Sequence, residues 1–265
     1  MTVPMIENLP AIDIDCFLNA GTENDRTPSP GVRADLPFWQ AEYARLDVVA
    51  SAHCTHAAAK GGPCVAEENR RLQELLQTDR SRFQWVAAEP HDPASLRQAE
   101  SLLRSPQALG ILLPASTRSQ RVADFADELF ALAGKQNAAV MVQPAHIPEI
   151  VPFAEKYRNV NVIVPQLCTQ RLDKECLAEC IAQTVNLYTD TAGGPALLNN
   201  SLEFVVETCG ADKVLFASGG ESLAFEKARV LLSTLSREDQ EKILLHNALR
   251  LFPQMASQLS KEVSL

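Results

Sequence analysis

Histidine, cysteine and glutamate side chains form two small groups in the sequence. His53, Cys54 and His56 lie close together, and Glu89 and His91 form the second group. Imidazole, thiolate and carboxylate are the side chains that bind zinc in proteins. His53, His56 and His91 are therefore candidate ligands of a metal ion, and the alternative is that they are ordinary polar loop residues.

Two aspartates and a serine offer acid–base chemistry that needs no metal. Asp15 and Asp190 are candidate general bases, and His91 would orient the base or polarise a carbonyl group. Ser218 precedes a pair of glycines, the first of which is Gly219, and glycines let a ligand approach the backbone closely. Because a serine nucleophile needs an adjacent base and none stands beside Ser218 in the sequence, we assign Ser218 and Gly219 to substrate binding.

Four more polar side chains are candidates for binding a substrate. Gln143 and Gln166 would donate hydrogen bonds to a carbonyl or carboxylate group, or would fill a cavity with a hydrogen-bond network of their own. His53 and Glu89 each stand near the end of an apolar segment, where a binding loop would begin.

These candidates stand at or near the ends of eight short apolar segments, which recur at regular distances. Most of them are nearly continuously apolar, as is typical of strands buried on both faces of a parallel sheet. The segments are Ala11–Cys16, Leu46–Ser51, Phe83–Glu89, Leu109–Pro114, Ala138–Gln143, Val160–Gln166, Thr184–Asp190 and Lys213–Ser218.

Helical patterns separate the apolar segments. Arg121–Lys135 has an apolar stripe of helical period, Asp92 is a predicted helix N-cap before Pro93, and Ser236 with Asp239 indicates a second capping pair. Eight strand–helix units predict a (β/α)₈ TIM barrel that forms a single domain over residues 1–265. A doubly wound open sheet is the competing architecture, and no GxGxxG loop supports it.

Two irregular segments follow the first two predicted strands. Leu18–Pro37 and Ala52–Cys64 are rich in proline and glycine, and both should lie at the carboxyl ends of the strands, where barrel active sites form. The alternative is that these loops plug the barrel or contact another subunit. Phe38, Trp39 and Tyr43 beside the first loop would make such a contact, although packing in the core is the favoured use.

The charge balance excludes several kinds of partner. The 265 residues carry a net charge of −9, which argues against nucleic acid and against an anionic membrane surface but leaves room for a small anionic molecule in a basic pocket. Residues Met1–Pro10 lack the features of a signal peptide, and the seven cysteines form no CxxC pair, so we expect a cytoplasmic protein with reduced thiols. A symmetric homodimer is the expected assembly.

Several segments resemble, in order and spacing, the amidohydrolase-related branch of the metal-dependent hydrolase superfamily. Ala11–Phe17 resembles the opening Ile-Asp-x-His-x-His strand of that family, and Gly210–Ser218 closely resembles the stretch before its catalytic aspartate. Further similar segments are Asp79–Phe83, Phe153–Tyr157 followed by Val162–Leu167, Asn186–Gly193 and Lys242–Ala248.

The resemblance implies a divalent metal that activates water, yet the positions of its ligands carry other residues here. The first-strand histidines fall on Asp15 and Phe17, the later ones on Gln143 and Gln166, and the eighth-strand aspartate on Gly219. Of these, Asp15 alone offers an ionisable ligand, so we predict no metal and no other cofactor.

Loss of the ligands leaves two hypotheses about function. The favoured one is a non-catalytic homologue that binds a small molecule or serves as a scaffold. The alternative is a metal-independent hydrolase of lactonase or amidase type, or a decarboxylase, that acts on a small carboxylated substrate with Asp15, His91 and Asp190 as catalytic residues.

Overall fold

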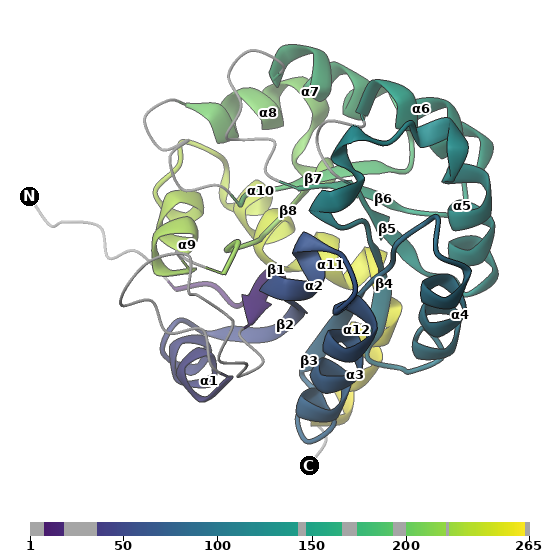
Figure 1. The fold of residues 1–265 in the computed structure, drawn as a ribbon. Helices are drawn as coiled ribbons and strands as arrows, with labels where there is room; N and C mark the ends of the chain where they lie inside the picture. The colour runs from purple at the N-terminus through teal and green to yellow at the C-terminus, as the bar shows by residue number, and fades with distance from the viewer. Residues whose placement is uncertain are drawn as a thin grey trace, which may run out of the picture.

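Eight parallel strands form a nearly closed barrel in the computed structural model, which describes residues 8–18, 36–142, 147–165, 174–192, 200–220 and 223–262 (Figure 1). The strands lie in the order of the chain, each paired with the next. The backbone N–H of Ile14 donates to the carbonyl of Phe216 at 3.0 Å, which joins the last strand to the first. The strands are β1 Ala11–Leu18, β2 Val48–Thr55, β3 Arg82–Ala87, β4 Ala108–Leu112, β5 Ala139–Met141, β6 Val162–Val164, β7 Leu187–Asp190 and β8 Val214–Leu215.

Helices surround this barrel, as Figure 1 shows, and the predicted (β/α)₈ fold is confirmed. None of the described helices is long and apolar enough to cross a membrane. The helices are α1 Leu36–Arg45, α2 His56–Lys60, α3 Val65–Leu76, α4 Pro93–Leu102, α5 Ala126–Lys135, α6 Ile147–Lys156, α7 Lys174–Gln183, α8 Ser201–Cys209, α9 Leu223–Leu231, α10 Arg237–Glu241, α11 Asn247–Leu251 and α12 Pro253–Glu262. Short 3₁₀ or π segments are η1 Ala115–Ser119, η2 Val122–Asp124, η5 Ala211–Lys213 and η6 Lys242–His246.

Both predicted helix caps are present. The Asp92 side chain accepts a hydrogen bond from the backbone N–H of Ala94 at 2.9 Å, and the Ser236 hydroxyl accepts one from that of Asp239 at 3.1 Å. Each cap satisfies a backbone N–H group that has no partner inside the helix.

The predicted loop after the second strand is wrong in its first half. β2 continues to Thr55, and α2 begins at His56 because the Thr55 hydroxyl caps it by accepting from the N–H of Ala58. Residues 52–55 lack the apolar run that would have shown the strand to continue past Ser51. In the other predicted loop, Leu18–Pro37, the first residue belongs to β1, and α1 begins at Leu36. Residues 19–35 lie outside the described residues.

Apolar side chains form one core inside the barrel and a second between barrel and helices. Trp39 and Tyr43 of α1 are buried in the outer core, as favoured from the sequence. Phe252 and Met255, at the start of the C-terminal helix, pack against the inner core. This helix reaches the first residue of β4, because Gln254 donates to the carbonyl of Ala108, so it covers the amino ends of the strands.

An irregularity in β1 determines which side chains face the barrel mouth. Asp13 pairs with Ser51 and Cys16 with His53, so three steps along β1 match two along β2. Ile14 belongs to the inner core and Cys16 to the outer core, and the extra residue between them is Asp15. Such a bulge re-aims side chains, and it brings Asp15 to the cavity described next.

Candidate functional site

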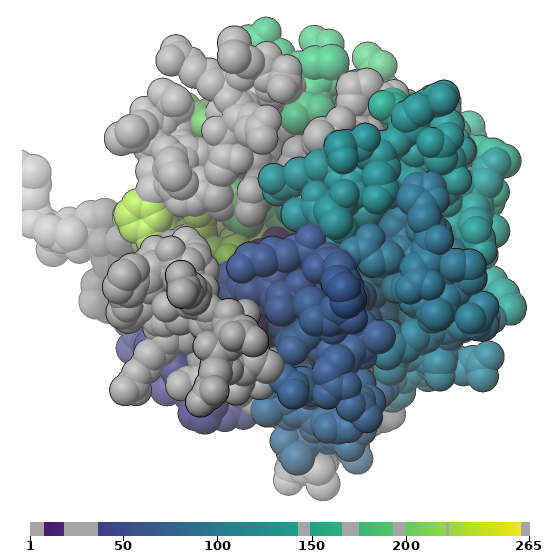
Figure 2. Space-filling view, viewed as in Figure 1, coloured from purple at the N-terminus to yellow at the C-terminus, as the bar shows by residue number. Residues whose placement is uncertain are grey.

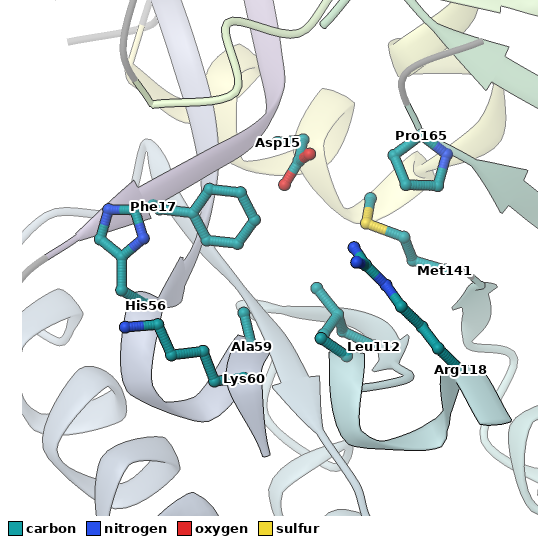
Figure 3. A pocket seen from close by; sticks show the side chains of 10 residues that line it. Asp15, Phe17, His56, Ala59, Lys60, Leu112, Arg118, Met141 and Pro165 are labelled. Carbon is teal, nitrogen blue, oxygen red and sulfur yellow. The ribbon is translucent and has the colours of Figure 1, made fainter. Parts of the chain in front are cut away.

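A cavity of about 220 Å³ lies at the carboxyl ends of the strands, the end at which barrel active sites form (Figure 3). The surface is hollowed there beside the dark-blue segment that carries α2 (Figure 2). Ligand pockets commonly enclose about 300–1,000 Å³, so this cavity suits a small molecule. Its lining residues are Asp15, Phe17, His56, Ala59, Lys60, Leu112, Ala115, Arg118, Met141 and Pro165.

Asp15 is the acidic residue of the cavity wall. Its side chain is 1% exposed, and within the described part of the chain its Oδ1 atom has no hydrogen-bond partner. Burial raises the pKa of Asp15 well above its usual range, and the charges of Asp190 and Asp13 raise it further. This environment favours the protonated form of the carboxyl group, which is the form that can donate a proton to a bound molecule.

Asp190 stands at the end of β7 and interacts electrostatically with Asp15, so the structure brings these two predicted catalytic residues together. Asp190 is buried, and its Oδ1 atom accepts from the N–H of Ala192 at 3.0 Å. Because like charges repel, two carboxyl groups that share a site do not readily ionise at the same time.

Ser218 is engaged with Asp13 rather than with the cavity. Its hydroxyl donates to Asp13 Oδ2 at 2.6 Å and its backbone N–H donates to Oδ1 at 2.9 Å. Burial raises the pKa of Asp13 to about 6 despite these hydrogen bonds. Gly219 lies beside Asp15 through its backbone, because its N–H donates to the Asp15 carbonyl at 2.9 Å.

Two cationic side chains, Lys60 of α2 and Arg118 of η1, line the cavity; the Arg118 guanidinium points toward Asp15, and the Lys60 amine lies near His56 (Figure 3). They give a protein of net charge −9 a basic pocket, which would attract a small anion. Sequence reasoning missed both residues. The available signal was their position, since each follows soon after the end of a strand, where side chains reach the barrel mouth.

The three histidines proposed as a relocated metal site, all of them among the described residues, do not form one. His53 is fully buried beside the ring of Tyr43 in the outer core, with its Nε2 atom 2.6 Å from the Ser51 hydroxyl. His56 stacks on Phe17 at the cavity, and the exposed His91 packs edge-on against Phe125.

His53 therefore points away from the cavity to which we assigned it, because residues alternate between the two faces of β2. Ala52 and Cys54, its neighbours, take the inward positions. Burial lowers the pKa of His53 to about 3, so it stays neutral.

Glu89 and His91 also do not line the cavity. Glu89 instead joins two loops at its rim, accepting hydrogen bonds from the N–H of Gly62 and the hydroxyl of Ser116. Gln143 and Gln166 lie outside the described residues, as does His146.

A family model described as amidohydrolase matches residues 14–254. The chain belongs to the amidohydrolase family. No curated protein sequence matches it.

Solved structures of this fold cover nearly the whole chain. A 2,6-dihydroxybenzoate decarboxylase from Rhizobium is 13% identical with a TM-score of 0.70, over 92% of this chain and 98% of the other. A proposed 2-pyrone-4,6-dicarboxylic acid hydrolase from Pseudomonas putida is 17% identical with a TM-score of 0.68, over 93% and 98%. A zinc-bound amidohydrolase from Burkholderia multivorans is 16% identical with a TM-score of 0.74, over 92% and 99%.

These likenesses show the fold, and they give no support to the prediction of a non-catalytic homologue, because the matched proteins bear the names of enzymes.

The described residues of this amidohydrolase-family barrel do not fit the family's metal ion. Phe17 places an apolar ring where the family has a histidine, and Gly219 offers no side chain where it has an aspartate. No three His, Cys, Asp or Glu side chains in the described ranges are grouped so that they could hold a metal.

Proposed function

We propose that this protein is an acid–base enzyme that decarboxylates a small carboxylate without a metal ion. The observation that carries this proposal is the buried Asp15 carboxyl group, which faces a small cavity lined by the cations Lys60 and Arg118. The names of the matched decarboxylase and hydrolase, both of which concern ring carboxylates, support the choice of substrate class.

The cavity supplies what decarboxylation needs. Arg118 and Lys60 attract the anion and orient it. Phe17, Leu112 and Met141 provide apolar walls that disfavour a carboxylate and favour the neutral carbon dioxide that leaves.

The proton for the reaction comes from Asp15. It moves from the Asp15 carboxyl group to the substrate carbon that bears the carboxylate. The bond between that carbon and the carboxylate then breaks, its electron pair stays on the substrate, and carbon dioxide departs. Asp15 is left ionised and takes up one proton from solvent in each turnover.

Hydrolysis of a lactone or amide is the second candidate, and the pairing of Asp15 with Asp190 favours it. In such a pair one carboxyl group holds the proton while the other is ionised and can take a proton from water. The two reactions have different pH dependence. Decarboxylation needs protonated Asp15 and slows as the pH rises, whereas hydrolysis needs one ionised carboxylate of the pair and first accelerates as the pH rises, then slows when the second carboxyl group ionises.

The test uses full-length protein treated with a chelator, with 2,6-dihydroxybenzoate and 2-pyrone-4,6-dicarboxylate as probe carboxylates. We expect release of carbon dioxide from a probe, with a loss of about 10²-fold or more in kcat for Asp15→Asn, the range for removal of a general acid. Hydrolysis of 2-pyrone-4,6-dicarboxylate without carbon dioxide would select the second candidate.

Binding of either probe to the cavity with no turnover at any pH would contradict both candidates and favour a non-catalytic binder. Turnover that requires added metal would contradict the metal-free mechanism.

A further inference from the structure

Glu89 occupies a position between the two loops that carry the cations of the cavity. Its Oε1 atom accepts a hydrogen bond from the backbone N–H of Gly62 at 2.7 Å and another from the hydroxyl of Ser116 at 2.8 Å. Gly62 follows α2, which ends at Lys60, and Ser116 belongs to η1, which carries Arg118. A single carboxylate oxygen therefore joins the two segments.

The backbone of Glu89 is itself fixed. It lies just beyond β3, and its N–H donates to the hydroxyl of Ser95 at 3.0 Å, while its carbonyl accepts from the N–H of Asp92 at 3.1 Å. Both partners belong to the start of α4, where Asp92 is the cap. Glu89 is thus held by the barrel and α4, and the two loops are held by Glu89.

The packing around this oxygen leaves no room for a side chain at Gly61. A Cβ atom there would lie 2.2 Å from Ser116 Oγ and 2.5 Å from Glu89 Oε1, and the φ angle of +92° also favours glycine. α2 and η1 are in contact at this point. The close approach of α2 to η1 therefore depends both on the absence of a side chain at Gly61 and on the carboxylate of Glu89.

We propose that Glu89 is a positioning residue, which fixes the separation of Lys60 and Arg118 by binding Gly62 and Ser116 through one oxygen atom. Its effect on anion binding rests on the function proposed above, whereas its effect on the loops does not. Loss of the carboxylate releases the α2 and η1 loops, so the separation of the two cations is no longer fixed. Glu89 does not touch the substrate, since it does not line the cavity.

The first measurement is amide hydrogen exchange on the full chain, over residues 57–64 and 114–120. Glu89→Leu removes the accepting oxygen and should raise exchange in both segments, while Glu89→Gln keeps an accepting oxygen and should stay near wild type. Ser116→Ala removes one contact at an exposed site and should raise exchange in residues 114–120, which tests the proposal even if Glu89→Leu does not fold. Glu74→Leu, at an exposed position of α3, is the matched control and should change neither segment.

The second measurement is the affinity for 2,6-dihydroxybenzoate by titration calorimetry. Glu89→Leu should weaken binding about tenfold, with Glu89→Gln within about threefold of wild type, because misplaced contacts lose their binding energy. Unchanged exchange in Glu89→Leu would overturn the proposal, and so would Glu89→Gln behaving like Glu89→Leu in both measurements. A wild-type protein that does not bind the probe would count against the proposed function, and exchange would still decide the role of Glu89.

Discussion

Asp15 combines a nearly complete loss of solvent contact with a position on a cavity wall. Burial and the charges of two neighbouring aspartates favour its protonated form, and Lys60 and Arg118 favour an anion across the cavity. A neutral acid on one side and two cations on the other is an arrangement suited to binding a carboxylate and protonating it.

Arg118 should contribute more to binding than to the proton transfer. Its guanidinium offers a paired hydrogen bond to a carboxylate, so Arg118→Gln should raise the KM for a probe carboxylate by about tenfold or more while kcat changes less. Steady-state kinetics, or calorimetry if turnover is slow, measures the effect. Arg121→Gln, at an exposed position just after η1, is the control and should leave KM unchanged. Equal effects of the two substitutions would argue against Arg118 as the anion site.

At the scale of the elements, the sequence was enough to predict the eight strands and most helices, because buried parallel strands and amphipathic helices have distinct periods. The bulge that turns Asp15 toward the cavity could not be predicted, since one extra residue in a strand leaves no mark in the apolar pattern. His53 was misplaced for a different reason: β2 continues past the predicted end at Ser51 to Thr55, so His53 lies inside the strand, where the alternation of side chains turns it to the outer face. The sequence did not predict Lys60 and Arg118 as cavity residues, because they look like ordinary surface residues until the positions of α2 and η1 relative to the barrel are known.

One buried asparagine, Asn69, shows how helices are attached to the barrel below the site. Its amide donates to the carbonyl of Ala87 at 2.7 Å and accepts from the N–H of the same residue at 3.0 Å. Asn69→Ala would leave both groups of β3 buried and unpaired, which should cost about 1–3 kcal/mol for each in the free energy of unfolding. Urea denaturation measures the loss. Glu74→Ala on the exposed face of α3 should change the free energy by less than about 0.5 kcal/mol, and a similar effect of the two substitutions would contradict this role of Asn69.

Several carboxyl groups of the native protein are buried away from water, so its free energy of unfolding should fall as the pH rises. Burial raises the pKa of Glu226 from 4.5 to about 7, although Arg229 lies 3.3 Å away and lowers it, and it raises that of Asp13 to about 6. Between the unfolded and folded pKa values the native state binds more protons, so this stabilisation is complete below the unfolded pKa and is lost as the pH rises through the folded one.

Glu226→Gln should therefore flatten the pH dependence of stability. The free energy of unfolding of wild type should fall from about pH 5 to about pH 8, and the decline should be smaller in the variant, because glutamine does not titrate. Urea denaturation at several pH values provides the comparison. Identical slopes for the two proteins would show that Glu226 is hydrated and ionises normally in the native state.

The central claim is that protonated Asp15 drives a metal-free reaction of a small carboxylate. The most direct measurement is the pH dependence of kcat for carbon dioxide release from 2,6-dihydroxybenzoate, with chelator-treated wild-type protein and Asp15→Asn. The account predicts turnover that falls as the pH rises through the raised pKa of Asp15 and that is lost, with the fold intact, in the variant. Turnover that appears only after a divalent metal is added and that persists in Asp15→Asn would contradict it.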